Sequence, residues 1–407
     1  MKTNLNNIKK DYFWNTLGTI FYAFNSLIFL VIVTRINGLE IAGYFSFGLV
    51  LSLIFYAIAS YGGRNYQITD YKNEFTEKEY VSFRFRTTLI TIIIALLFSL
   101  LYCDNLTKAL IIILLILEKC VESISDVFYG IMQKKGELST VGKSMFIKSI
   151  LSLFFFFLLD YLFENVVFSL VAYLFINLLV LIFYDIKKSK YIFSKQTKAL
   201  SYMKIFRNCF AYFILSFLVN YVYNIPRYVL DINMAPNFQG IFGIIVMPVS
   251  VLLLIVQFII QPQIVNMTKY YESDFPNFKL LIRKIINLVL VFSLISLIAA
   301  YFIGIPFLNS IYNVNLDEYK LEFIICLIGG IFYLIVFILL NPLTIMRKGK
   351  AQMIIYIING FISIILSILL ISRYLFSGAV ISYSVTMILL SVSYCLYYLY
   401  MVRGEKV

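Results

Sequence analysis

The sequence has no histidine, one tryptophan and few charged residues. Asp, Glu, Lys and Arg make up 14% of its 407 residues, whereas a soluble domain carries about 25%. Without histidine the chain lacks the base of Ser-His and Cys-His catalytic sites and a common nitrogen ligand of zinc. Its five cysteines are an odd number without framework spacing, so the sequence predicts neither a disulfide scaffold nor a metal site.

Apolar residues take the place of the missing charges. Hydrophobic residues make up 61% of the chain, and its mean hydropathy is +0.90. A soluble protein of this length could not hide so much apolar surface, so lipid must serve as its solvent. The net charge of +13 does not indicate a nucleic-acid partner, because the cations recur in short clusters between apolar runs.

Twelve apolar runs are long enough to cross a bilayer, which takes a helix of about 20 residues. The first run has no cleavage site of small residues, so we expect it to stay in the protein as a helix. The sequence therefore predicts an all-α, polytopic membrane protein. The expected spans are 13–33, 41–62, 85–103, 108–131, 145–163, 166–184, 209–230, 240–262, 282–304, 321–341, 351–371 and 377–400.

The lysines and arginines predict the orientation of these spans. Most of the 34 cations fall at the two termini and in the segments 63–86, 132–148, 185–207, 263–284 and 342–350, with the largest cluster in 185–207. The opposite side has only Arg35, Lys108, Arg227, Lys320 and Arg373. Since basic residues mark the cytoplasmic side, both termini are predicted to be cytoplasmic and the number of spans even.

The longest polar stretch lies between the sixth and seventh spans and predicts two six-helix lobes, 1–200 and 201–407. A short repeated sequence pattern relates the lobes. Arg35 precedes a Gly-aromatic segment from Gly43, and Arg227 precedes a similar one from Gly240. Transporters are often built from such repeats, with a site at their interface.

Three carboxylates in the fourth span are the clearest candidate for function. Glu118, Glu122 and Asp126 recur every four residues, so they share one helix face that cannot point at lipid. One interpretation is a proton- or ion-responsive set on a translocation path, since three acids exceed what one lysine neutralises. The other is a set of buried pairs that holds helices together, such as Glu122 with Lys119.

Cations near or within spans form the second candidate site: Arg35, Arg64, Lys119 and Arg227. They could extend to lipid headgroups, as long basic side chains do at helix ends, or they could bind phosphate in a central vestibule. The second interpretation is favoured for Arg227, which follows an unusually polar run that includes Tyr223. Both interpretations stay open for Arg35 and Arg64.

The arrangement resembles the polysaccharide-unit flippases of the superfamily that also contains the multidrug and toxic-compound extruders. The similarity covers the whole chain as architecture, with short and loose motifs. These are Arg35-Ile-Asn-Gly38, Gly43-Tyr-Phe, Gly62-Gly-Arg-Asn65, the fourth span from Glu118 to Gln133, and Arg227 through Gly240-Ile-Phe-Gly243.

The resemblance implies a transporter of the bacterial inner membrane with this superfamily's fold, and no enzyme activity. It would move an oligosaccharide unit of capsule or O-antigen on undecaprenyl pyrophosphate to the outer leaflet by alternating access. Expected partners are this lipid-linked substrate, membrane lipids, a polysaccharide polymerase and a chain-length regulator. No cofactor is expected, and proton or sodium coupling through the acids is a hypothesis. The alternatives are an ion-coupled multidrug extruder and, with less support, a membrane-embedded polymerase.

Overall fold

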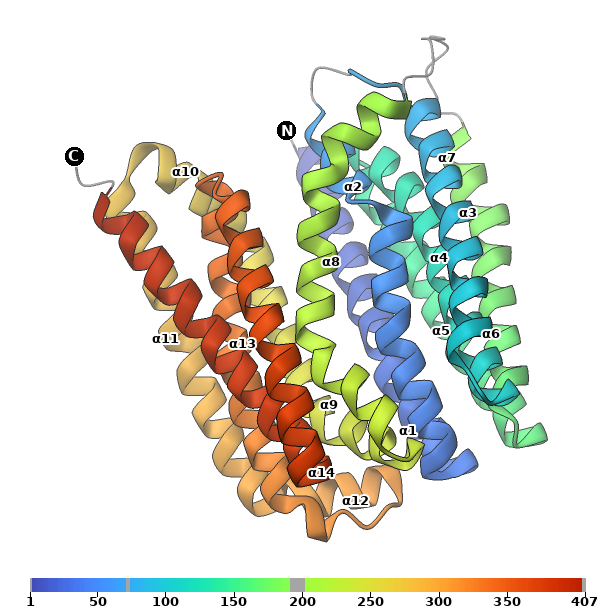
Figure 1. Ribbon diagram of the computed structural model, residues 1–407. Helices are drawn as coiled ribbons and strands as arrows, with labels where there is room; N and C mark the ends of the chain where they lie inside the picture. The colour runs from blue at the N-terminus through green and yellow to red at the C-terminus, as the bar shows by residue number, and fades with distance from the viewer. Residues whose placement is uncertain (1, 71–73, 191–201, 405–407) are drawn as a thin grey trace. The chain divides into compact units, whose positions relative to one another are not determined.

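The computed structural model describes residues 2–70, 74–190 and 202–404, and these residues are almost entirely helical, with no β-strand among them (Figure 1). They fall into two compact units, Met1–Phe217 and Leu218–Val407, called here the N-terminal and C-terminal units. The division lies within one long helix, α8 (Tyr202–Asn233). The predicted lobe boundary at residue 200 lies outside the described residues and stays a prediction.

The N-terminal unit is built from long helices joined by short connections. Its elements before α8 are α1 (Lys2–Ser60), α2 (Gly63–Thr69), α3 (Glu77–Tyr102), α4 (Leu106–Lys134), α5 (Leu138–Phe163), α6 (Val166–Val180), η1 (Leu181–Ile186) and α7 (Lys187–Ser189). Helix α3 begins with a capping box in which Thr76 and Glu79 bond each other's backbone N–H groups. Such caps satisfy donors that a helix start leaves free.

The C-terminal unit is likewise built from long helices joined by short connections. After α8 its elements are α9 (Pro236–Ile260), η3 (Gln261–Gln263), α10 (Ile264–Ser273), α11 (Phe275–Ala299), η4 (Ala300–Gly304), α12 (Ile305–Tyr312), η5 (Asp317–Tyr319), α13 (Lys320–Ile345) and α14 (Gly349–Gly404). Helix α13 packs against α9, α11 and α14. It is therefore the central helix of this unit.

Two of the helices each contain two spans. Helix α1 is interrupted at Gly38, whose φ of 82° suits a residue without a Cβ. Helix α14 is interrupted at Leu375, with φ 51°. Nine helices of the described chain are long and apolar enough to cross a membrane. Counting both halves of α1 and α14, and adding the more charged α4, gives the twelve predicted spans, so the all-α polytopic fold is confirmed.

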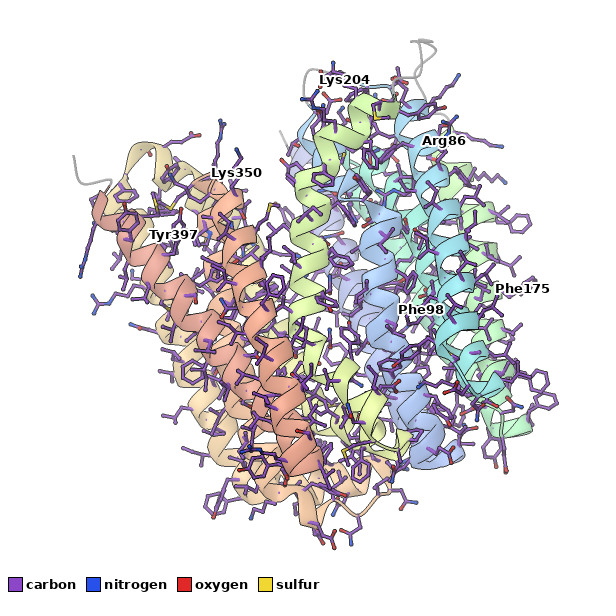
Figure 2. All side chains as sticks on the ribbon, viewed as in Figure 1. Arg86, Phe98, Phe175, Lys204, Lys350 and Tyr397 are labelled. Atoms are coloured by element: carbon purple, nitrogen blue, oxygen red, sulfur yellow. The ribbon has the colours of Figure 1, made fainter. Side chains whose placement is uncertain are left out.

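Apolar side chains on the outside of the units match this membrane setting. In the most apolar window of α3 only 28% of the residues are buried, and in that of α11 only 17%. Phe98 and Phe175 are among the aromatic side chains on the helices of the N-terminal unit, and Phe175 points away from it (Figure 2). A surface this apolar is stable only against hydrocarbon.

Candidate functional site

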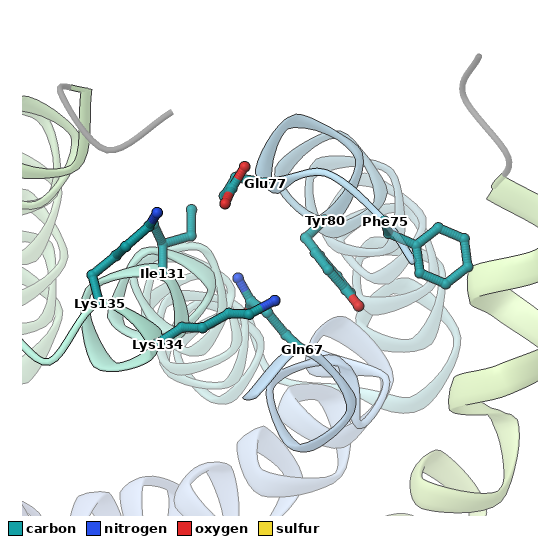
Figure 3. A pocket seen from close by; sticks show the side chains of 7 residues that line it. All are labelled: Gln67, Phe75, Glu77, Tyr80, Ile131, Lys134 and Lys135. Carbon is teal, nitrogen blue, oxygen red and sulfur yellow. The ribbon is translucent and has the colours of Figure 1, made fainter. Parts of the chain in front are cut away.

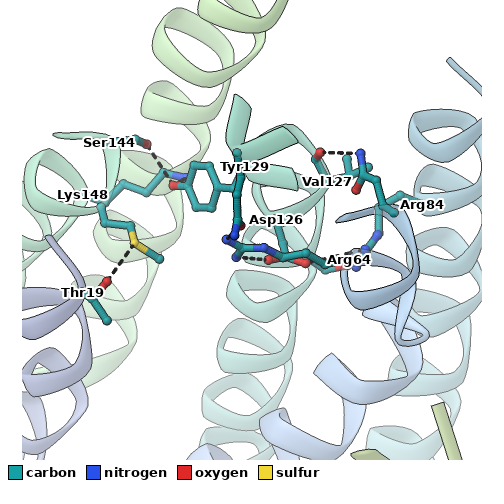
Figure 4. Close-up of polar contacts among 12 residues, drawn as sticks. Thr19, Arg64, Arg84, Asp126, Val127, Tyr129, Ser144 and Lys148 are labelled. Atoms are coloured by element: carbon teal, nitrogen blue, oxygen red, sulfur yellow. Dashed lines mark hydrogen bonds and ion pairs between the residues drawn. The ribbon is translucent and has the colours of Figure 1, made fainter. Parts of the chain in front are cut away.

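Each of the three acids on α4 has a basic partner in the structure. Lys119 lies between Glu118 and Glu122. Its Nζ is 3.7 Å from Glu118 and forms an ion pair with Glu122. Asp126 accepts a hydrogen bond from Arg64 of α2 at 2.7 Å (Figure 4). The structure thus brings five of the eight predicted site residues together, because α2 packs on α4.

Arg84 of α3 completes this group and was not predicted. Its guanidinium lies 3.6 Å from the second oxygen of Asp126 and donates to the hydroxyl of Ser123 at 3.3 Å. The side chain is one of the largest fully buried in the chain, whereas the sequence placed it among the cytoplasmic cations. Its helical spacing to Thr87 and Thr91, which are also buried, was the signal that could have located it.

The count of charges changes the interpretation of the acids. Glu118, Glu122 and Asp126 meet three cations, Lys119, Arg64 and Arg84. The two acids in excess of one lysine are therefore balanced by arginines from the neighbouring helices α2 and α3. The pairing of Glu122 with Lys119 matches the structural interpretation, while Glu118 keeps its Oε1 buried without a hydrogen-bond partner among the described residues. Ion coupling through these residues stays a prediction.

A second buried ion pair joins α5 to η1 and contacts α4. Lys148 of α5 donates to Asp185 at 2.7 Å, to Ser125 at 2.5 Å and to Tyr129 at 3.0 Å. These bonds use all three ammonium protons. Ser144 in turn donates to Asp185 at 2.5 Å. Lys148 was counted as a cytoplasmic cation, yet it is only 2% exposed.

Asp185 belongs to η1, a π-helical stretch that continues α6. Single π turns change which face of a helix a residue occupies, and here the π stretch carries a buried carboxylate. Asp185 was not predicted as a site residue, because it stood just beyond the expected end of the sixth span.

Arg35 is separate from this cluster. It lies on α1 three residues before the interruption at Gly38, and its side chain is exposed. An exposed arginine at the end of a span fits contact with lipid headgroups. Phosphate binding by Arg35 stays a prediction.

The remaining predicted residues, Arg227 and Tyr223, form a polar site inside the C-terminal unit. The Nε of Arg227 donates to the side chain of Gln239 at 3.2 Å, and the amide of Gln239 donates back to the Arg227 carbonyl at 2.6 Å. The guanidinium lies 5.5 Å from the ring centroid of Phe242. Arg227 is 6% exposed, so it is a buried cation and not a surface anchor.

Tyr223 belongs to a group of tyrosines beside Arg227. Its hydroxyl accepts a hydrogen bond from Tyr383 at 3.0 Å, and its ring centroid lies 4.6 Å from that of Tyr333. Tyrosines combine an apolar face with a hydroxyl, a pattern suited to sugars and to other tyrosines. The structure places Tyr223 four residues, about one helical turn, before Arg227 on α8.

A small pocket lies where α2, α3 and α4 meet. Its volume is only about 10 Å³, and its polar lining comes from Gln67, Glu77, Lys134 and Lys135 (Figure 3). Nearby, the Tyr66 hydroxyl donates to Glu74 and accepts from Asn208, both at 2.8 Å. Burial, together with the bond to Glu74, raises the pKa of Tyr66 to about 12. It therefore stays protonated and ties α2 to α8.

No group of three or more Cys, Asp and Glu in the described part of the chain is placed to hold a metal ion. The polar contacts that the structure describes in both units are ion pairs and hydrogen bonds between side chains. Such groups can bind anions, protons or sugars, depending on which side chains exchange partners.

The architecture has close counterparts among solved structures. An inward-facing multidrug resistance MATE family transporter of the MOP superfamily superposes with a TM-score of 0.73 at 13% identity, covering 96% of this chain and 95% of that one. The lipid II flippase MurJ, in an inward closed conformation, gives 0.71 at 15% identity, covering 94% and 87%. The chain shares the fold of these structures, so the architecture that the resemblance implied is confirmed.

One curated relative extends the similarity to the sequence. The chain is 26% identical over 400 residues to the capsular polysaccharide biosynthesis protein CapF of Staphylococcus aureus, covering 96% of this chain and 98% of that one. No protein-family model matches the chain. The solved structures with this MOP fold include transporters and a flippase, so the chain is a multi-pass membrane protein with the architecture of such proteins.

Proposed function

We propose that the protein is a flippase that moves undecaprenyl-pyrophosphate-linked oligosaccharide units from the cytoplasmic to the outer leaflet for surface polysaccharide synthesis. The observation that carries this proposal is the near full-length similarity to a capsular polysaccharide biosynthesis protein. The fold shared with a lipid II flippase supports it, because the substrate proposed here is also a lipid that must change leaflet. Alternating access is the transport mode expected of such folds.

In this proposal Arg64 binds the pyrophosphate by exchanging partners. Its side chain is 28% exposed, whereas its partner Asp126 is 8% exposed. A diphosphate could therefore reach Arg64 and replace the carboxylate, with Arg84 left to neutralise Asp126. Arginine suits this exchange because it binds carboxylate and phosphate with the same planar fork. Lys119, Arg227, Tyr223 and Arg35 are further candidate substrate contacts.

Coupling to an ion gradient is assigned in this proposal to Glu118, with Glu122 and Asp126 as its neighbours on the same helix face. Glu118 is 1% exposed, and its Oε1 has no hydrogen-bond partner among the described residues. A buried carboxyl with a free oxygen can take up a proton at lower cost than one held by an arginine. Transport by a Glu118→Gln variant that still responded fully to a proton or sodium gradient would exclude this role.

The remaining assignments are that the chain is not an enzyme, lies in the bacterial inner membrane with both termini cytoplasmic, and works beside a polysaccharide polymerase and a chain-length regulator. The clusters of cations on alternate connections support the orientation. Within the N-terminal unit, Arg86 and Lys204 lie at the end where α1 begins (Figure 2). This placement fits a cytoplasmic N-terminus.

Deletion of the gene, followed by analysis of lipid-linked glycans, tests the function in the cell. We expect one undecaprenyl-linked unit to accumulate on the cytoplasmic side, together with loss of surface polysaccharide. A multidrug extruder is the second candidate, because a multidrug resistance transporter shares the fold. Unchanged surface glycan with increased sensitivity to cationic dyes would support the extruder and contradict the flippase.

A further inference from the structure

A hollow in the C-terminal unit lies between α11 and α14 and takes no part in the function proposed above. Helix α13 packs against both of these helices, and Leu339 of α13 lines the hollow together with residues of the other two. Its volume is about 320 Å³. Small-molecule sites enclose roughly 300–1,000 Å³, so the hollow has room for a ligand and is more than a packing defect.

The walls of this hollow are apolar. Ile282 and Leu339 are buried, and Leu399 on α14 is 50% exposed. Apart from two cations, the lining consists of aliphatic side chains, one tyrosine and one cysteine. A void beside such walls forfeits dispersion contacts, and in a bilayer the molecules available to fill it are acyl chains.

The two cations lie on one face of α11. Lys279 and Arg283 are four residues apart, so their side chains are neighbours on the helix surface. No acidic residue lines the hollow, and within the described ranges neither cation forms an ion pair with a carboxylate. Two adjacent positive charges beside an apolar hollow match a ligand with an anionic head and an apolar tail.

The sequence places this end of α11 beside a cytoplasmic connection, because 263–284 is one of the basic clusters on the predicted inner side. Anionic phospholipids are concentrated in that leaflet, and basic pockets between transmembrane helices there bind their headgroups. We propose that this hollow binds one anionic phospholipid, with its phosphate between Lys279 and Arg283 and an acyl chain against Ile282, Leu339 and Leu399.

Native mass spectrometry of the full-length protein, titrated with phosphatidylglycerol or phosphatidylcholine, tests this site. The double variant Lys279→Gln/Arg283→Gln should bind phosphatidylglycerol on the order of 30-fold more weakly. The matched control Lys269→Gln/Lys284→Gln removes two exposed cations outside the lining and should leave this affinity unchanged. Phosphatidylcholine should bind the wild type and both variants equally.

A second pair of variants tests the proposed contact between the acyl chain and the hollow. Leu399→Trp places a large ring in the hollow and should weaken phosphatidylglycerol binding, whereas Leu396→Trp, at an exposed site on the same helix outside the lining, should not. The proposal is overturned if the charge variant keeps wild-type affinity or if its control loses as much. It is also overturned if phosphatidylcholine binds the wild type as tightly, or if inorganic phosphate alone raises its unfolding temperature as much as phosphatidylglycerol does.

Discussion

At the scale of single residues, Asp126 is the most informative position because two arginines share it. Arg64 approaches one carboxylate oxygen at 2.7 Å and Arg84 the other at 3.6 Å. Arg84 is buried, while Arg64 is partly exposed. The two arginines therefore have different roles in this account, Arg84 in neutralising Asp126 and Arg64 in meeting substrate.

Replacing Arg84 should destabilise the protein more than replacing the nearby Arg86. Arg84→Gln leaves Asp126 paired with Arg64, but the buried Ser123 hydroxyl and the second Asp126 oxygen lose their partner, which costs about 1–3 kcal/mol. Arg86 is exposed and lies 3.5 Å from the Tyr202 ring centroid; losing such a contact costs about 0.5–1 kcal/mol. Thermal unfolding in detergent should show this order, and equal losses would contradict the assignment of Arg84.

Neutralising Asp126 should change both the affinity for substrate and the rate of transport. In Asp126→Asn the guanidinium of Arg64 loses its resident anion, so we expect tighter binding of an undecaprenyl pyrophosphate ligand and slower turnover. Asp160→Asn is the control, because Asp160 is buried but bonds Asn37 and Ser169 and not arginine. Binding titration and a flipping assay measure both effects. Weaker binding by Asp126→Asn would contradict the exchange of partners.

At the scale of elements, the spans could be predicted because each needs a long apolar run, and such runs are visible without a fold. The partners of charged residues could not, because Arg84 and Lys148 stand beside polar connections where cations usually mark the cytoplasmic side. Only the packing of α3 and α5 on α4 shows that both are buried. The repeated sequence pattern of Arg35 and Arg227 does not extend to their burial, since the first is exposed and the second buried.

The close packing of α1 on α5 predicts how glycine substitutions affect stability. A Cβ on Gly142 would lie 2.1 Å from the Trp14 carbonyl oxygen, whereas one on Gly349 would meet nothing within 4 Å. Small residues allow helix backbones to approach in membranes. Gly142→Ala should therefore lower the free energy of unfolding by about 1–3 kcal/mol, while Gly349→Ala should be neutral or stabilising. Chemical denaturation in micelles compares the two, and a neutral Gly142→Ala would contradict this contact.

At the scale of the whole molecule, the proposed direction of transport requires both termini on the cytoplasmic side. In a background without native cysteines, Lys350→Cys should react with an impermeant maleimide only after the cells are permeabilised. Glu318→Cys, on the predicted outer side, should react in intact cells. Both positions are exposed in the structure. The reverse pattern would invert the topology and with it the proposed direction of transport.

Reconstitution into proteoliposomes tests whether the protein translocates a lipid-linked oligosaccharide. The measurement is the fraction of an undecaprenyl-pyrophosphate-linked oligosaccharide that becomes accessible to an external glycosidase over time. We predict that this fraction rises with wild-type protein and stays at the protein-free level with Arg64→Gln. No translocation by the wild type, together with gradient-driven movement of a cationic dye in the same vesicles, would contradict the account.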